Sequence, residues 1–182
     1  MKGGEAQGVI VWTIGHSTHA AEEFDQIITG HKIQLVADVR AFPSSRRYPQ
    51  FNKENLAPAL AALHIKYEHL PLLGGRRKPS DQSRNVALKN PFFRAYADYM
   101  ETDDFRRGTA NLFELATRQR TAIMCAEAVW WRCHRSLIAD YLKVQGVRVI
   151  HLLSVTKAQD HVYTAAASVR EGKLSYGGLL VT

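Results

Sequence analysis

The feature that most constrains the fold is an uninterrupted apolar run near the N-terminus, VIVWTIG at residues 9–15. Most of its residues are β-branched, and Gly15 ends it. Such a run is typical of a strand that is buried on both faces, as in a parallel sheet covered by helices. Four later segments are predicted as further strands: residues 34–40, 65–70, 121–125 and 147–153.

Segments with helical spacing lie between these strands. We expect helices that begin at Thr18 as N-cap, at Asn52, at Asn90 with Pro91, at Asp103 and at about Arg135. Strands alternating with helices predict an α/β fold of three layers: a mostly parallel sheet of about five strands with helices on both faces, Rossmann-like or flavodoxin-like.

The chain is predicted to be a single domain over residues 1–182, because it contains no repeat and no linker-like segment. Residues 1–8 are expected to be a flexible N-terminus. The tail over 165–182 is weakly patterned, with a helix expected at 164–169 and an edge strand at 174–180.

Composition indicates a globular protein of the cytoplasm. Hydrophobic residues make up 46% and charged residues 23%, which is ordinary for a soluble domain. No run is long enough for a transmembrane helix, and the apolar stretch at 9–14 is too short for a signal-peptide core. We therefore expect a cytoplasmic location, no membrane partner and reduced thiols; two cysteines cannot form a disulfide framework. Oligomeric state stays open.

The formal net charge is +7, which favours an anionic partner or substrate. Lys and Arg outnumber Asp and Glu most clearly between Arg40 and Arg84. This stretch is either a solvated loop surface or an anion-binding face.

Polar residues follow the predicted strands at the points where the strands end. In parallel α/β sheets, ligands bind outside the carboxyl ends of the strands, so these residues are expected to share one pocket. The candidates for binding an anion or substrate are Ser17, Arg40, Ser44, Arg46, Gly74, Gly75, Arg76, His134 and Arg135. Arginine suits bidentate recognition of phosphate or carboxylate, and a strand-to-helix turn such as the one at Gly15 presents backbone N–H groups.

The densest chemistry lies in TAIMCAEAVWWRCHRSLIADYL, residues 121–142, which holds both cysteines. Cys133 precedes a predicted helix, where N–H groups and the helix dipole stabilise a thiolate. Cys133 is thus a candidate nucleophile, with Cys125 as an alternative nucleophile or a redox partner. Either cysteine could instead be a buried structural residue. Glu127, His16 and Asp38 are candidate general acids or bases.

A metal site is the weaker alternative for the same residues. Cys125, Cys133 and His134 offer two thiolates and an imidazole, which suit zinc or iron. Against this, the spacing is not a paired Cys-x-x-Cys, and adjacent residues on a helix would point apart. No cofactor is predicted.

The motifs TIGHST, DVRAFPSSRRYPQFN, YEHLPLLGGRR, YADYM and MCAEAVWWRCHRSLIADYL resemble the bacterial and archaeal family called domain of unknown function 488 (DUF488). The resemblance runs from about residue 12 to 164. It implies two possibly functional cysteines, Cys125 and Cys133, and no established activity. The pair Trp130 and Trp131 departs from the shorter, more polar stretch usual in the family.

Together these observations predict an enzyme that acts on a phosphorylated, nucleotide or nucleic-acid-derived substrate. The alternative is a non-catalytic module that binds nucleic acid or nucleotides through basic loops and aromatic stacking. Trp130 and Trp131 would then stack on bases, cover the pocket, fill a core edge or form a protein interface.

Overall fold

A computed structural model describes residues 8–178, and most of the expected N-terminal extension lies outside this range. Its sheet has six strands in the order β3-β2-β4-β1-β5-β6. Five are parallel: β1 (Ile10–Gly15), β2 (Leu35–Asp38), β3 (Lys66–His69), β4 (Thr121–Cys125) and β5 (Arg148–Leu152). The predicted α/β fold with a mostly parallel sheet is confirmed.

The sixth strand, β6 (Ala158–Asp160), was not predicted. It pairs antiparallel with β5 at the edge of the sheet, and all three of its residues are exposed. A short, solvent-facing edge strand carries no apolar pattern, so nothing in its sequence marks it as a strand.

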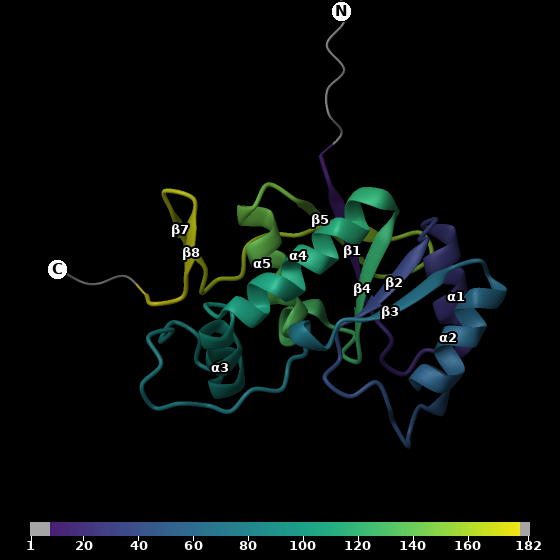
Figure 1. Ribbon diagram of the computed structural model, residues 1–182, viewed down its shortest axis with the longest axis horizontal. Coiled ribbons are helices and arrows are strands. Elements are labelled where there is room, and N and C mark those ends of the chain that lie inside the picture. Colours follow the sequence, from purple (N-terminus) through teal and green to yellow (C-terminus); the bar gives the residue numbers. More distant parts are fainter. Residues whose placement is uncertain (1–7, 179–182) are drawn as a thin grey trace, which may run out of the picture.

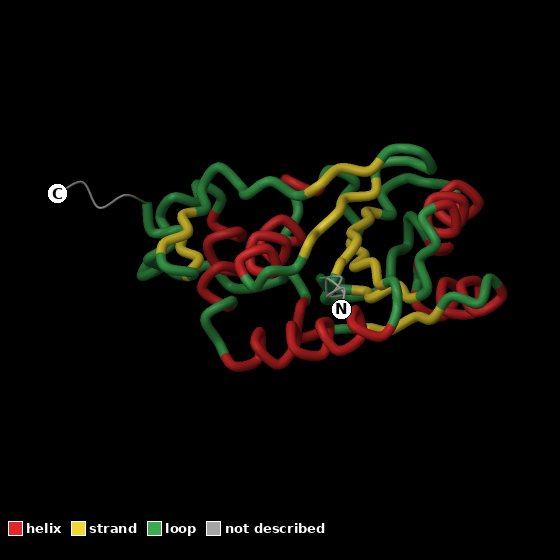
Figure 2. The backbone as a smooth tube through the Cα atoms, turned by 90° about the horizontal axis from the view of Figure 1, so that it is seen from above, coloured by secondary structure: helices red, strands yellow, loops and turns green. Residues whose placement is uncertain are grey.

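Helices cover both faces of this sheet, as Figures 1 and 2 show. The helices α1 (Ala21–Gly30) and α2 (Lys53–Ala62) pack on one face. The helices α3 (Pro91–Tyr99), α4 (Asp103–Arg118) and α5 (Arg135–Val144) pack on the other. The domain thus has the three layers that alternating strands and helices predict.

Alternate residues of each central strand enter different cores, which is why the strands are apolar throughout. In β1, Val11 packs with the α3–α5 side, whereas Trp12 and Ile14 pack with the α1–α2 side. In β4, Ile123 packs with the α3–α5 side and Met124 with the α1–α2 side. Side chains of a strand point alternately to its two faces, so a strand buried on both needs apolar residues at successive positions.

The predicted helix starts are partly wrong. Helix α1 begins after Ala20, which makes no side-chain cap, and not at Thr18. Asn52 precedes α2, but its side chain accepts a hydrogen bond from the backbone N–H of Ser45 and leaves the helix uncapped. Asn90 does cap α3, accepting from the N–H of Phe92, as predicted.

The C-terminal part differs from its prediction. Residues 164–169 do not form a helix; instead β7 (Ser168–Arg170) and β8 (Lys173–Ser175) form a separate antiparallel hairpin. The turn between them places Glu171 at φ 48° and Gly172 at φ 72°, and a two-residue turn of this kind joins antiparallel strands. The predicted edge strand at 174–180 is therefore limited to the start of that range, and residues 179–180 lie outside the described part.

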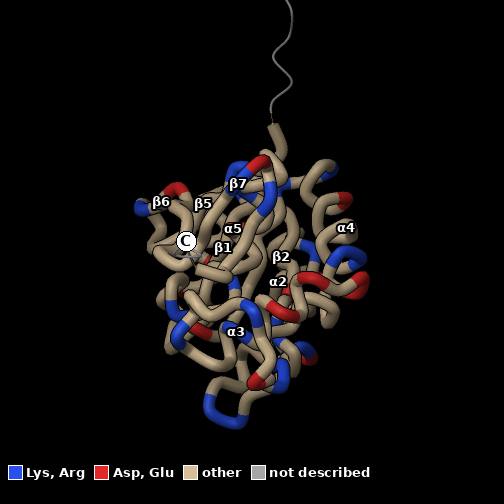
Figure 3. Tube along the Cα trace, turned by 90° about the vertical axis from the view of Figure 1, so that its left-hand side faces the viewer, with Lys and Arg blue, Asp and Glu red and all other residues tan. Residues whose placement is uncertain are grey.

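Three short 3₁₀ turns complete the loops at the carboxyl edge of the sheet: η1 (Pro49–Phe51), η2 (Pro71–Leu73) and η3 (Trp130–Arg132). Lys and Arg are spread over several of the surrounding loops, while α4 carries both signs of charge (Figure 3). Within residues 8–178, no helix is both long and apolar enough to cross a membrane.

Candidate functional site

A cleft of about 690 Å³ opens at the carboxyl edge of the sheet. The chain runs from β1 to β2 and later inserts β4 between them, so the ends of β1, β4 and β2 are neighbours. Gly15 pairs with Cys125 at this edge, and Asp38 pairs with Met124. The cleft therefore lies where ligands bind in sheets of this type, and residues from all three strand ends reach it.

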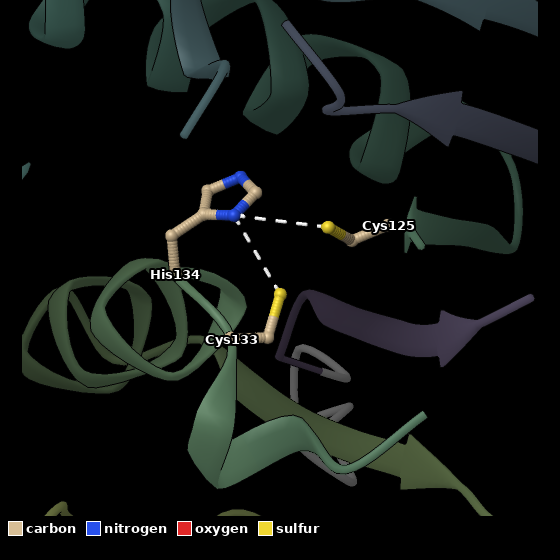
Figure 4. A group of neighbouring side chains, drawn as sticks. All are labelled: Cys125, Cys133 and His134. Atoms are coloured by element: carbon tan, nitrogen blue, oxygen red, sulfur yellow. Dashed lines mark hydrogen bonds between the residues drawn. The ribbon is translucent and has the colours of Figure 1, made fainter. Parts of the chain in front are cut away.

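The floor of the cleft brings together Cys125, Cys133 and His134. The Nδ1 atom of His134 lies 3.7 Å from the sulfur of Cys125 and 3.6 Å from the sulfur of Cys133. Figure 4 shows the imidazole ring facing both sulfurs. Cys133 is extended, with φ −124° and ψ 149°, and so is not helical. Adjacent side chains therefore meet at one point, contrary to the sequence argument that they would point apart.

The orientation of His134 is fixed by its other nitrogen. Nε2 lies 3.1 Å from the carbonyl oxygen of Val39, which can only accept a hydrogen bond. Nε2 therefore carries a proton, and Nδ1 is the nitrogen that faces the sulfurs. Gly75 approaches this ring so closely that a Cβ there would lie 2.6 Å from Nδ1. Its lack of a side chain leaves room beside Nδ1.

The start of α5 stabilises negative charge on Cys133. The sulfur accepts the backbone N–H of Arg135 at 3.5 Å, in the manner of a side chain that caps a helix. Burial raises the pKa of Cys133, but contacts with Cys125, His134 and Arg135 outweigh it and hold that pKa well below its usual range. The pKa of Cys125 is raised by its contact with Cys133 and by burial. Of the two sulfurs, Cys133 is the one that ionises first.

The wall beside β2 is built on a buried ion pair. Asp38 accepts hydrogen bonds from the backbone N–H and guanidinium of Arg40 and from the hydroxyl of Tyr67. Asp38 is fully buried and does not line the cleft. Its carboxylate fixes Arg40 in place and is not positioned to act as the general base proposed for it.

His16 lines the cleft, but both of its ring nitrogens are engaged. Nδ1 lies 3.1 Å from the carbonyl oxygen of Ser17, and Nε2 lies 3.2 Å from Nη1 of Arg40, which can only donate. The ring also stacks on Phe51, with centroids 4.4 Å apart. Burial and the charge of Arg40 lower the pKa of His16 to about 4, so the ring is neutral near pH 7.

The predicted anion-binding residues divide into those that reach the cleft and those that do not. Ser17, Arg40, Ser44, Gly75, Arg76 and His134 line it, whereas Arg46, Gly74 and Arg135 do not. Two arginines that were not among the candidates, Arg47 and Arg132, line it as well.

The backbone anion site expected after β1 is not available. The N–H of His16 donates to the carbonyl of Cys125, and the N–H of Ser17 donates to that of Ala126. These bonds extend the pairing of β1 with β4. The N–H groups of His16 and Ser17 are therefore not free to bind an anion.

Arg135 is buried and points away from the cleft, which corrects its predicted role. Its guanidinium donates to the carbonyl oxygens of Glu127 and Ala128 and to the hydroxyl of Thr13. It thereby holds the loop that follows Cys125 against the end of β1. This close approach requires Gly15, because a Cβ there would lie 1.9 Å from the carbonyl oxygen of Glu127. The carboxylate of Glu127 stays exposed on the cleft wall, as a candidate acid or base should.

A buried chain of hydrogen bonds leads from Arg135 to Asp140. The residues beyond Arg135 in this chain were not among the predicted site residues. Arg135 donates to Thr13, whose oxygen lies 2.7 Å from Nδ1 of His151. Nε2 of His151 lies 2.9 Å from Nδ1 of His161, and Nε2 of His161 lies 2.8 Å from Asp140. Because a carboxylate only accepts, Nε2 of His161 donates its proton to Asp140.

This chain anchors the C-terminal segment and one of the two tryptophans. Asp140 also accepts hydrogen bonds from Thr164 and from the hydroxyl of Tyr176. Trp130 stacks on His151 with ring centroids 4.1 Å apart and is buried. Trp131 is 57% exposed, so only Trp130 has the structural role considered for the pair.

Fold and site together define an α/β protein with a polar cleft at the carboxyl edge of its sheet and a centre of two cysteines and one histidine on the cleft floor. The chain belongs to the family described as Domain of unknown function DUF488, whose model matches residues 20–142. This span runs from just before α1 into the last turn of α5 and includes Cys125, Cys133 and His134. No curated protein and no solved structure matched the chain.

Proposed function

We propose that the protein is a cytoplasmic enzyme that acts on an anionic substrate bound in this cleft, with Cys125, Cys133 and His134 as its reactive centre. The substrate class is a phosphorylated small molecule, a nucleotide or a nucleic-acid-derived group.

The charge of the cleft supports an anionic substrate. Arg47, Arg76 and Arg132 are exposed around it, and Arg40 contributes from below. Glu127 is the only carboxylate among the lining residues. Guanidinium groups match the geometry of phosphate and carboxylate oxygens, and an arginine-lined cleft attracts anions.

The observation that carries the proposal is the state of the polar atoms on the floor. Nδ1 of His134 and the two sulfurs face one another, and the three residues line the cleft. The other contacts of these atoms are backbone N–H groups, from Arg135 to the sulfur of Cys133 and from Glu127 to the sulfur of Cys125, so no other side chain occupies them. Groups of this kind, close together and open to a ligand, are what reaction centres need.

The centre can work in two ways. In the first, the proton of Cys133 passes to Nδ1 of His134, the sulfur attacks the electrophilic atom of the substrate, and the bond from that atom to its leaving group breaks as His134 returns the proton to the leaving group. In the second, both sulfurs and Nδ1 hold a metal ion. Both routes place the reacting atom of the substrate on the cleft floor, beside the exposed carboxylate of Glu127, and both require Cys133.

A nucleic-acid-binding module is the second candidate, because aromatic rings lie at the rim beside arginines. The guanidinium of Arg76 lies 5.3 Å from the ring of Phe42, and that of Arg47 lies 5.5 Å from the ring of Tyr48. Phe42 and Phe92 are each more than 60% exposed. Such surfaces stack bases without requiring any reaction.

A thermal-shift screen with phosphorylated metabolites, nucleotides and short single-stranded oligonucleotides tests the substrate class, since a specific ligand raises the apparent melting temperature. We expect the shift to be lost in Arg76→Ala and Arg132→Ala. Arg118→Ala is the matched control, because Arg118 is exposed on α4 and pairs with Glu114. Shifts that survive both cleft substitutions would place the anion elsewhere.

Mass spectrometry of each ligand after incubation then separates an enzyme from a binding module. An enzyme converts the ligand, and Cys133→Ser abolishes conversion but retains the thermal shift. Binding without conversion by the unmodified protein would favour the module.

A further inference from the structure

We propose that Cys125, Cys133 and His134 form a binding site for Zn²⁺, with a fourth coordination position open to the cleft. Binding of the ion is inferred from geometry alone. The use of the open position by a substrate rests on the proposed function.

The distances from Nδ1 of His134 to the two sulfurs match the sulfur–nitrogen edges of a zinc tetrahedron. Bonds of about 2.3 Å to sulfur and about 2.0 Å to nitrogen give tetrahedral edges of roughly 3.5 Å between sulfur and nitrogen. The observed edges from Nδ1 are 3.7 Å to Cys125 and 3.6 Å to Cys133. All three ligand atoms lie within 4.8 Å of one another. Little movement is therefore needed to bring each atom to bonding distance of one ion.

The histidine is already prepared as a ligand. Its Nε2 proton is bound by the carbonyl of Val39, which fixes the ring and directs Nδ1 to the sulfurs. Zinc-bound histidines regularly donate their second N–H to a carbonyl or carboxylate in this way. Gly75 keeps the space beside Nδ1 free of a side chain.

The backbone holds the two thiolate ligands on different elements. Cys125 ends the central strand β4, while Cys133 immediately precedes the start of α5 and is bound through its sulfur to the N–H of Arg135. Both cysteines are buried. Two thiolates neutralise the charge of one Zn²⁺, which removes the cost of burying isolated charges at this site.

The number of ligands distinguishes this site from a purely structural one. Structural zinc sites have four protein ligands, whereas catalytic sites have three and leave a position for water or substrate. The three residues line the cleft, so the open position faces the space that Arg76 and Glu127 also line. An oxygen of an anionic substrate, or a water molecule, can complete the tetrahedron there.

The test uses the full chain, purified without a polyhistidine tag, reduced, stripped with a chelator and dialysed against Zn²⁺ or Co²⁺. We expect about one equivalent of zinc per chain and, with cobalt, absorption bands of tetrahedral thiolate coordination. Cys125→Ser, Cys133→Ser and His134→Gln should each lose the cobalt–thiolate spectrum or retain far less zinc. His16→Gln is the matched control in the same cleft and should keep both. Circular dichroism checks that each variant is folded.

The inference is overturned if the reduced wild-type protein retains less than about a tenth of an equivalent of zinc, gives no cobalt–thiolate bands and keeps two thiols that react freely with a disulfide reagent in the presence of Zn²⁺. If such a protein still converts an anionic ligand in a Cys133-dependent manner, the proposed function stands with sulfur as the attacking atom. If zinc binds but no anionic ligand does, the metal site stands and the proposed function fails.

Discussion

Two regions that flank the start of α5 use similar residues in opposite ways. On the cleft floor, His134 meets two sulfurs, and these atoms remain available for a ligand. On the other side, His151 and His161 lie between Thr13 and Asp140, and each ring nitrogen has one partner. The two histidines of the buried chain have every ring nitrogen hydrogen-bonded and do not line the cleft, whereas His134 does line it. The difference between the histidines lies in their surroundings: His134 meets two sulfurs on the cleft floor, whereas His151 and His161 bind a hydroxyl, each other and a carboxylate in the interior.

The largest expected effect on stability comes from substituting Asp140, the residue at the end of the buried hydrogen-bond chain. Asp140→Ala removes the acceptor for His161, Thr164 and Tyr176 and leaves their donors buried without a partner. We expect the free energy of unfolding to fall by about 4–5 kcal/mol, measured by urea denaturation. A loss below about 1 kcal/mol would show that the chain contributes little.

The adjacent tryptophans form a matched pair. Trp130→Ala removes a buried ring that stacks on His151 and should cost about 3–4 kcal/mol. Trp131→Ala changes an exposed ring and should alter stability by no more than about 0.5 kcal/mol. Equal effects in denaturation experiments would contradict the different roles assigned to them.

Lowering the pH should reduce the folding stability of the protein, because His151 is buried in a neutral form. Burial, His161 and Arg135 lower the pKa of this residue to about 3 in the folded protein, below its ordinary value of 6.5. As pH falls through 6.5 the unfolded state takes up a proton that the folded state refuses, so stability decreases between about pH 6.5 and pH 3. At about pH 4.5 the contribution of His151 to the loss relative to neutral pH should be roughly 2–3 kcal/mol.

His151→Gln is the control for this pH dependence. The variant is expected to be less stable at neutral pH, yet it should lose about 2–3 kcal/mol less than the wild type on acidification to about pH 4.5. Parallel stability curves for the two proteins would remove His151 as the cause.

Substitution in the centre should affect stability much less than substitution in the buried hydrogen-bond chain. Cys133→Ser keeps the size and the capping geometry of the residue, so unfolding free energy should fall by only about 1 kcal/mol, while zinc binding and ligand conversion are lost. A loss of stability as large as that of Asp140→Ala would indicate that Cys133 is chiefly structural.

Local pattern was enough to predict the sheet and the edge where the site lies. Residues 9–15 and 121–125 are apolar because both faces of β1 and β4 are buried, and the topology then places Cys125 beside the ends of β1 and β2. Membership in DUF488 is likewise visible in the motifs around the cysteines. The alternation of strands and helices predicts a pocket at the carboxyl ends of the strands, and the strand order seen in the structure determines which of those ends are neighbours.

The finer roles depend on side-chain direction, which the sequence does not carry. Arg135 follows His134 directly, yet it points into the interior and binds the loop after Cys125. His151 and His161 gave no signal, because the partners of each lie on other elements. The convergence of Cys133 and His134 depends on the extended backbone of Cys133 just before α5, a conformation that the expected helix had obscured.

Conversion of an anionic ligand by two variants tests the central claim most directly. The ligand is the strongest hit of the thermal-shift screen, and Cys133→Ser is compared with Asp140→Asn at a temperature where both are folded. The account predicts that Cys133→Ser lowers the conversion rate by at least about a hundredfold, whereas Asp140→Asn, which alters the closed chain, converts at nearly the wild-type rate. Full activity in Cys133→Ser, or loss confined to Asp140→Asn, would contradict it.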